Sequence, residues 1–160
     1  MKKSAKRQIR PLVNPLTVAI KRASPVTPDV VQHLRLREWS AIEAFAQGKA
    51  TSVDVALLEE LLCMCLCSIE LGIGPEAQAT CDAAELVFAA LRARSPANTP
   101  MVMNSEEIAV MRDLQSYHDQ QRAACNRREY SHMADMVAEA IALNLARLNE
   151  EPQRTEAVTA

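Results

Sequence analysis

The chain has 160 residues, a net charge of −2 and 49% hydrophobic residues, which is enough apolar material for one packed domain of ordinary size. Aromatic residues make up only 3% and glycine occurs three times. This composition disfavours β-sandwiches, barrels and the glycine-rich loops of nucleotide-binding folds. We therefore expect an all-α protein.

The first 26 residues form a basic arm, which holds seven cations and no acidic residue. Residues 27–160 hold the other 11 cations and all 20 acidic residues, a net charge of −9. This asymmetry is typical of an arm that meets a polyanion, an acidic protein surface or a membrane face, and a solvated terminus without a partner is the alternative. We expect residues 1–13 to be flexible and residues 14–24 to form a short docked or partner-induced turn that begins at Asn14-Pro15.

The apolar runs of the sequence are too short to predict an export signal or a membrane span. The longest apolar stretch of the arm is Val18-Ala19-Ile20, whereas a secretory signal needs about 7–15 apolar residues. The most apolar run of the whole chain covers residues 61–67, far short of the roughly 18–20 residues that span a bilayer. We therefore predict a cytoplasmic protein that contacts no membrane.

Two helices are predicted before the first glycine pair. Thr27-Pro28 supplies an N-cap followed by a proline at the first helical position, which predicts a helix over about 28–47. Glu38 interrupts its apolar stripe and is expected to lie at the rim or to be paired. A second helix is predicted over about 52–71, with Gly72 just after its end. Its second half is apolar nearly all round, so we expect it to be the central, most buried helix.

Three further helices follow. Gly72-Ile73-Gly74-Pro75 predicts a tight break and a third helix over about 75–94, paired with the second as an antiparallel hairpin. After a proline-containing loop, Asn104-Ser-Glu-Glu107 resembles a capping box that starts a fourth helix. A turn at Asn126-Arg127-Arg128 separates a fifth helix, and one continuous helix is the alternative. The expected organisation is a basic, mostly flexible arm (1–26), a bundle of four to five helices (27–149) and a disordered tail (150–160).

The run Cys63-x-Cys65-x-Cys67 resembles a metal-binding motif. On a helix, however, Cys63 and Cys67 share a face while Cys65 points elsewhere, and the neighbouring residues are apolar. Structural zinc sites usually draw on other spacings, and a buried free cysteine behaves as a small hydrophobe. We therefore interpret these cysteines as reduced thiols in the core, and predict no metal and no cofactor.

The sequence predicts no catalytic residue. His118 and Cys125 fall on one helical face but are separated by about 10 Å along the axis, too far for direct proton transfer. The glutamates do not form the Glu-x-x-His pairs of a di-iron bundle, and no phosphate-binding, dinucleotide-binding, zinc-protease or serine-hydrolase motif occurs. We expect that the protein is not an enzyme.

A second group of cations lies on and after the fourth helix. Cations at the end of a helix often only complement its dipole, but with the arm they make a discontinuous basic surface. Polar residues of this helix partly match a DNA-recognition helix, although the loop before it does not fit helix-turn-helix spacing. The residues predicted to bind nucleic acid or an acidic partner are Lys2, Lys3, Lys6, Arg7, Arg10, Lys21, Arg22, Arg122, Arg127 and Arg128.

Several short motifs resemble small helical proteins encoded on prophages and conjugative elements of Gram-negative bacteria. They are Gly72-Ile-Gly-Pro-Glu76, Tyr117-His118 with Gln121-Arg122, and Glu129-Tyr130, after a Lys/Arg-Pro start. The resemblance covers about residues 70–135, includes no catalytic signature and transfers no site residue. It implies an accessory protein of a mobile element.

Two hypotheses about function follow. The first is a non-enzymatic regulatory binding protein of a phage or mobile element, whose arm contacts nucleic acid or an acidic partner. The alternative is an inhibitor or adaptor that blocks a host complex through its acidic helical body. The sequence leaves open whether the partner is DNA, RNA or protein, and whether the chain forms a dimer.

Overall fold

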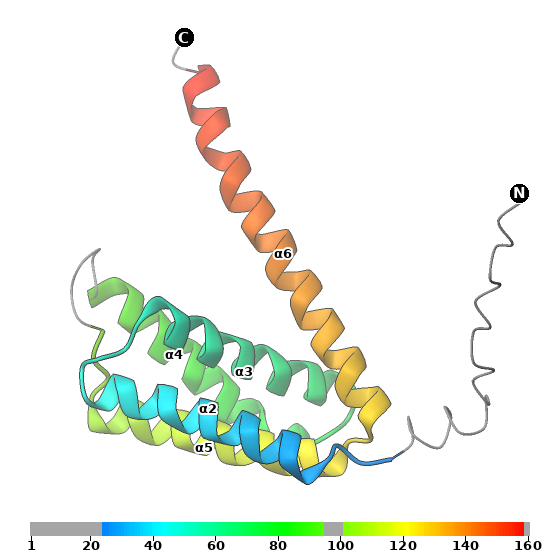
Figure 1. The fold of residues 1–160 in the computed structure, drawn as a ribbon. Coiled ribbons are helices and arrows are strands. Elements are labelled where there is room, and N and C mark those ends of the chain that lie inside the picture. Colours follow the sequence, from blue (N-terminus) through cyan, green and yellow to red (C-terminus); the bar gives the residue numbers. More distant parts are fainter. Residues whose placement is uncertain (1–23, 95–100, 159–160) are drawn as a thin grey trace, which may run out of the picture.

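The computed structural model describes residues 24–94 and 101–158, with side chains as far as residue 142, and this part of the chain is helical (Figure 1). No strand occurs among the described residues, where extended pairing is limited to two isolated bridges. The predicted all-α class is confirmed there, whereas residues 1–23 of the basic arm lie outside the described residues. The elements are α2 (Pro28–Ala46), α3 (Ser52–Glu70), a 3-10 turn η1 (Pro75–Ala77), α4 (Gln78–Arg94), α5 (Ser105–Ala124) and α6 (Arg127–Val158).

Side-chain hydrogen bonds mark the starts of α3 and α5. At the start of α5, Asn104 Oδ1 accepts hydrogen bonds of 2.9 Å from the backbone N–H groups of Glu106 and Glu107, and the Glu107 carboxylate accepts one of 2.8 Å from the Asn104 N–H. The predicted capping box is therefore confirmed. Before α3, the backbone N–H and the hydroxyl of Thr51 both donate to the Asp54 carboxylate at 2.7 Å.

The chain turns sharply between α5 and α6. Asn126 accepts hydrogen bonds from the backbone N–H groups of Arg128 and Glu129 through its Oδ1, and its own N–H donates to the Glu129 carboxylate at 2.9 Å. This second Asn-x-x-Glu capping box starts α6. The predicted turn is confirmed and the alternative of one continuous helix is wrong. Arg127 and Arg128, however, are the first residues of α6 rather than part of the turn.

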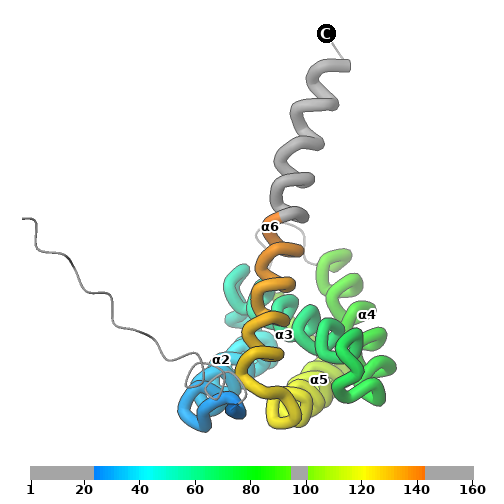
Figure 2. The backbone as a smooth tube through the Cα atoms, turned by 90° about the vertical axis from the view of Figure 1, so that its right-hand side faces the viewer, coloured from blue at the N-terminus to red at the C-terminus, as the bar shows by residue number. Residues whose placement is uncertain are grey.

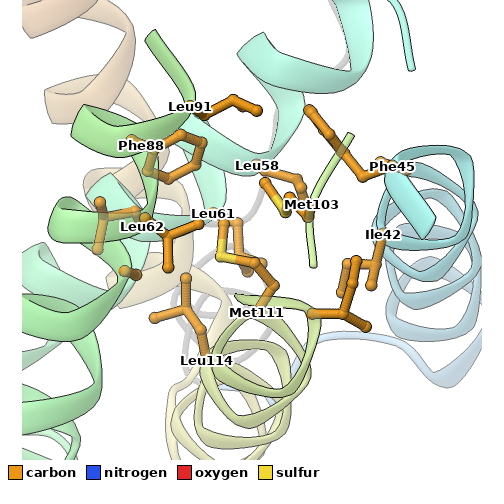
Figure 3. Packing of buried hydrophobic residues seen from close by; sticks show 14 of the residues in the cluster. Ile42, Phe45, Leu58, Leu61, Leu62, Phe88, Leu91, Met103, Met111 and Leu114 are labelled. Carbon is orange, nitrogen blue, oxygen red and sulfur yellow. The ribbon is translucent and has the colours of Figure 1, made fainter. Parts of the chain in front are cut away.

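Helix α3 lies at the centre of the bundle, because it contacts α2, α4, α5 and α6. Figure 3 shows its Leu58, Leu61 and Leu62 among apolar side chains from the helices around it. Phe88 comes from α4 and Met111 from α5, and both are buried. The predicted central position of this helix is therefore confirmed.

Helix α6 packs against α3 and then leaves the other helices, as Figures 1 and 2 show. Met133 and Val137 form a second small cluster with Met64 of α3 and Cys125. The backbone of α6 is helical as far as Val158, where the sequence predicts a disordered tail from residue 150. Glutamate, glutamine, arginine and alanine, which favour helix, make up six of residues 150–158, whereas Pro152 among them does not favour helix.

Over residues 24–94 and 101–158, none of the helices has the long apolar stretch that crossing a bilayer requires.

Candidate functional site

The last described residues of the basic arm are fixed against the start of α6. The backbone N–H of Arg127 donates to the carbonyl oxygen of Ser24 at 2.8 Å, and Pro25 forms a bridge with Asn126. These contacts join two segments that lie about a hundred residues apart in the sequence. The arm therefore enters the body of the molecule beside the first turn of α6.

An open hollow of about 310 Å³ lies on the same turns of α6. Two guanidinium groups, a hydroxyl, an imidazole and one carboxylate line it, all on one face of the helix. The first four are groups that bind phosphate oxygens, arginine with two parallel hydrogen bonds, whereas the Asp135 carboxylate repels an anion. The lining residues are Arg127, Arg128, Ser131, His132 and Asp135.

The two arginines of this hollow are available to a ligand. Both are exposed, and neither forms an ion pair with a residue in the described ranges. The backbone N–H groups of Arg127 and Arg128 are occupied by Ser24 and Asn126, so side chains rather than the helix backbone would hold an anion. The positive end of the α6 dipole adds to their attraction for negative charge. We call Arg127, Arg128, Ser131 and His132 the basic end.

The prediction that Arg122 binds nucleic acid or an acidic partner is wrong. Its side chain is 0% exposed, so it lies outside any surface that a nucleic acid or an acidic partner can reach. Arg122 belongs to the inward face of α5, and it is paired there with Glu38 of α2. The pairing also decides between the two expectations for Glu38, which is buried and not at the rim.

Arg122 is the centre of a polar network between α2 and α5. Its guanidinium donates to Glu38 through Nη2 and to Asp119 Oδ1 through Nη1, the latter at 3.0 Å. Asp119 Oδ2 also accepts from Arg35 Nε at 2.7 Å and from Gln115 Nε2 at 2.9 Å. Two carboxylates therefore face two guanidinium groups and an amide. Because its charges are balanced internally, the network has little charge left over for a ligand.

His118 lies beside this network and is 1% exposed. Burial, together with the nearby Arg122 guanidinium, lowers the pKa of His118 to about 3, so the imidazole is neutral at neutral pH. Its Nδ1 has no hydrogen-bond partner among the described residues. A pocket of about 30 Å³ between His118, Glu38 and Tyr130 has room for about two waters. A space of this size does not admit an organic substrate.

The cysteines of α3 divide between two clusters, as their helical spacing predicts. Cys65 is buried in the main core, whereas Cys63 and Cys67 are half-buried against the Met133 cluster. Burial raises the pKa of the Cys63 and Cys67 thiols, which disfavours the thiolate form that reacts or binds metal. The core interpretation is therefore confirmed for Cys65 and only in part for Cys63 and Cys67. Among the described residues, no three side chains of the His, Cys, Asp and Glu type are grouped to hold a metal ion.

Of the ten predicted binding residues, the structure places three. Arg127 and Arg128 lie together at the basic end and Arg122 is buried. Sequence reasoning missed Ser131 and His132, although both follow the two arginines at a four-residue spacing that gives one helical face. The other seven, Lys2, Lys3, Lys6, Arg7, Arg10, Lys21 and Arg22, belong to residues 1–23 and lie outside the described residues.

Comparison with family models, with curated proteins and with solved structures finds no match to this chain.

Proposed function

We propose that the chain is a non-enzymatic, nucleic-acid-binding accessory protein of a phage or mobile element, which contacts phosphates through its basic arm and its basic end. The observation that carries this proposal is the anchoring of Ser24 and Pro25 against Asn126 and Arg127. Through this anchoring, the cation-rich arm joins the body next to two exposed arginines. The phage or mobile-element origin rests on the resemblance of the short sequence motifs alone.

The length of the covalent chain limits the distance between the last two cations of the arm and the basic end. Lys21 and Arg22 precede Ser24 by three and two residues, and each residue spans at most about 3.6 Å. Their backbones therefore lie within about 11 Å of Ser24, which is bonded to Arg127. We expect the seven cations of the arm to act together with the two arginines of the basic end. The rest of the body is acidic and repels a polyanion, so we expect contact to be confined to this end.

Salt dependence of binding tests the proposal. Each phosphate contact to duplex DNA adds about 0.9 to the slope of log affinity against log salt, so the seven cations of the arm give a slope of at most about −6. Deleting residues 1–13 removes five cations, and we expect the magnitude of the slope to decrease by up to about 4.5. Changing Arg127→Ser with Arg128→Ser should reduce it by up to about 2. The measurement is a titration of a labelled duplex and a labelled RNA at several salt concentrations.

A matched control removes the same charge elsewhere. Lys49 and Arg92 are exposed cations, the first just after α2 and the second in the last turn of α4. These ends of α2 and α4 lie at the opposite end of the bundle from the start of α6 (Figure 1). The double change Lys49→Ser with Arg92→Ser should leave the affinity and the slope unchanged. If the intact chain binds neither nucleic acid at low salt, or if the basic-end variant behaves like this control, the proposal is wrong. The inhibitor or adaptor hypothesis, in which the acidic body binds a host protein, then leads.

A further inference from the structure

The outward face of α2 carries two large apolar side chains that the core does not use. Helix α2 buries Ala41, Ile42 and Phe45 on its inward face. On the opposite face, Leu36 is 58% exposed and Trp39, the only tryptophan of the chain, is 39% exposed. An exposed tryptophan next to an exposed leucine is unusual on a surface that meets only water, and tryptophan is enriched at the centres of protein interfaces.

These two side chains line an open groove of about 450 Å³ along the second half of α2. The polar groups at the rim of the groove satisfy one another. Gln47 Nε2 donates to Glu43 at 2.9 Å, and Lys49 Nζ donates to Gln47 Oε1 at 3.0 Å. The polar groups of the rim therefore need few hydrogen bonds from an occupant. Covering the apolar surface of Leu36 and Trp39, in contrast, is favourable because it removes that surface from water.

Two cations at the groove form no ion pair with a described residue: Lys49, whose ammonium donates to the Gln47 amide, and Arg112, which lies next to the lining residues. The Arg112 guanidinium of α5 lies over the Trp39 ring, 5.9 Å from its centroid. Arg112 forms no ion pair with a residue that the structure describes, whereas Arg35 on the same side of α2 is paired with Asp119. A stacked guanidinium is held in place by the ring and keeps its N–H groups for a carboxylate.

We propose that this groove docks a protein segment that presents an apolar side chain to Leu36 and Trp39 and a carboxylate to Arg112, as one face of an acidic amphipathic helix does. Apolar anchors with a charged partner at the edge are the usual elements of helix-in-groove recognition. A nucleic-acid strand fits less well, because its phosphates spread negative charge along the whole groove, which Glu43 lines, whereas a helix needs only one carboxylate, placed at Arg112 and away from Glu43. The groove is separate from the basic end and does not depend on nucleic-acid binding.

Trp39 itself reports on the occupancy of the groove. Because it is the only tryptophan, its fluorescence in the full chain can be titrated with defined probes. The first probe is an amphipathic helical peptide of about 18 residues, or five turns, with leucine on one face and glutamate beside it. The second is the same peptide with lysine in place of glutamate, and the third is an oligothymidylate. We expect a saturable change with the glutamate peptide and affinity at least about tenfold weaker with the lysine peptide.

Two pairs of variants make the test specific. Leu36→Ser should weaken binding of the glutamate peptide about tenfold, whereas Leu86→Ser, which changes a 72% exposed leucine on α4, should not. Arg112→Glu should reverse the preference towards the lysine peptide. Circular dichroism melting checks that each variant is folded.

Three results would overturn the proposal. The first is equal affinity of the wild-type chain for both peptides, and the second is a saturable response to oligothymidylate that exceeds both. The third is the absence of any saturable change up to the solubility limit of the peptides.

Discussion

At the scale of single residues, the guanidinium of Arg122 is buried between two carboxylates, and its contact to Glu38 joins residues 84 positions apart. Taking these charges out of water is costly, so the pair stabilises the fold only because each partner compensates the other. Removal of one partner would leave a buried charge alone, which typically costs about 3–5 kcal/mol. Nothing local in the sequence distinguishes this arginine from the exposed Arg127 and Arg128, and only Glu38 within an apolar stripe indicates a buried partner.

His118 makes stability depend on pH in a defined direction. Its pKa is about 3 in the folded chain, because of burial and the nearby Arg122, and about 6.5 in an unfolded chain. Between these values the unfolded chain binds a proton that the folded chain does not. Stability therefore decreases as the pH falls through this window. From pH 7 to pH 5 we expect a loss of about 2 kcal/mol from this residue, measured by urea unfolding.

The variant His118→Gln isolates this contribution, because glutamine does not titrate. It should lower stability at pH 7 but flatten the decrease between pH 7 and pH 5. His33→Gln changes an exposed histidine and should keep the wild-type dependence. If His118→Gln and the wild type lose equal stability over this range, the imidazole is not held neutral by burial.

At the scale of elements, the connection between α3 and α4 depends on one glycine more than on its neighbour. Gly72 and Gly74 both have positive φ, of 77° and 64°. A Cβ at Gly72 would meet nothing, whereas one at Gly74 would lie 2.8 Å from Cγ of the buried Gln121. That Gln121 side chain donates to the Ile73 carbonyl at 3.1 Å, so it cannot move aside without loss of a hydrogen bond.

Alanine at these two positions should therefore have different effects. Gly72→Ala should lower the free energy of unfolding by about 1–2 kcal/mol, because alanine is strained in the left-handed backbone conformation. Gly74→Ala has the same strain and must also displace Gln121, so we expect it to lower the free energy of unfolding by at least about 1 kcal/mol more than Gly72→Ala does. Urea unfolding curves of both variants measure the difference. Equal losses would show that Gln121 yields freely and does not fix this turn.

The elements themselves could be predicted from local signals. Pro28 at the first helical position indicates the start of α2, although the Thr27 side chain makes no cap hydrogen bond, and the capping box of Asn104 and Glu107 indicates the start of α5. Both signals act within a few residues. The cysteine faces followed from helical periodicity in the same way. The capping box of Asn126 and Glu129 has the same form, and the Asn-x-x-Glu spacing is the local signal that places Arg127 and Arg128 on the helix and not in the turn.

At the scale of the whole molecule, the sequence predicted the centre of the bundle but not the sites on it. Helical periodicity shows which face of α3 is apolar, and a helix that is apolar nearly all round must be surrounded. It does not show which distant segments meet. The contact of Ser24 with Arg127 and the stacking of Arg112 on Trp39 depend on tertiary packing, so neither the basic end nor the groove could be read from the pattern.

The central position of α3 leads to a prediction about the entire fold. Leu62 is buried in the core, and aspartate there would place an unpaired carboxylate among apolar side chains. The expected cost is above about 4 kcal/mol, a large part of the roughly 5–15 kcal/mol that holds a domain of this kind together. Because α3 contacts all four other described α-helices, we expect Leu62→Asp to unfold them together.

Val53→Asp is the matched control, since it introduces the same charge in the same helix. Val53 is 69% exposed in the first turn of α3, where a carboxylate also favours the helix dipole, so this variant should melt like the wild type. Circular dichroism at 222 nm reports all the helices, and the emission of Trp39 reports α2 separately. We expect both signals to be lost in Leu62→Asp. If Leu62→Asp keeps the wild-type melting temperature, or if Trp39 keeps its emission while helicity falls, then α2 does not depend on α3 and the bundle does not fold as one unit.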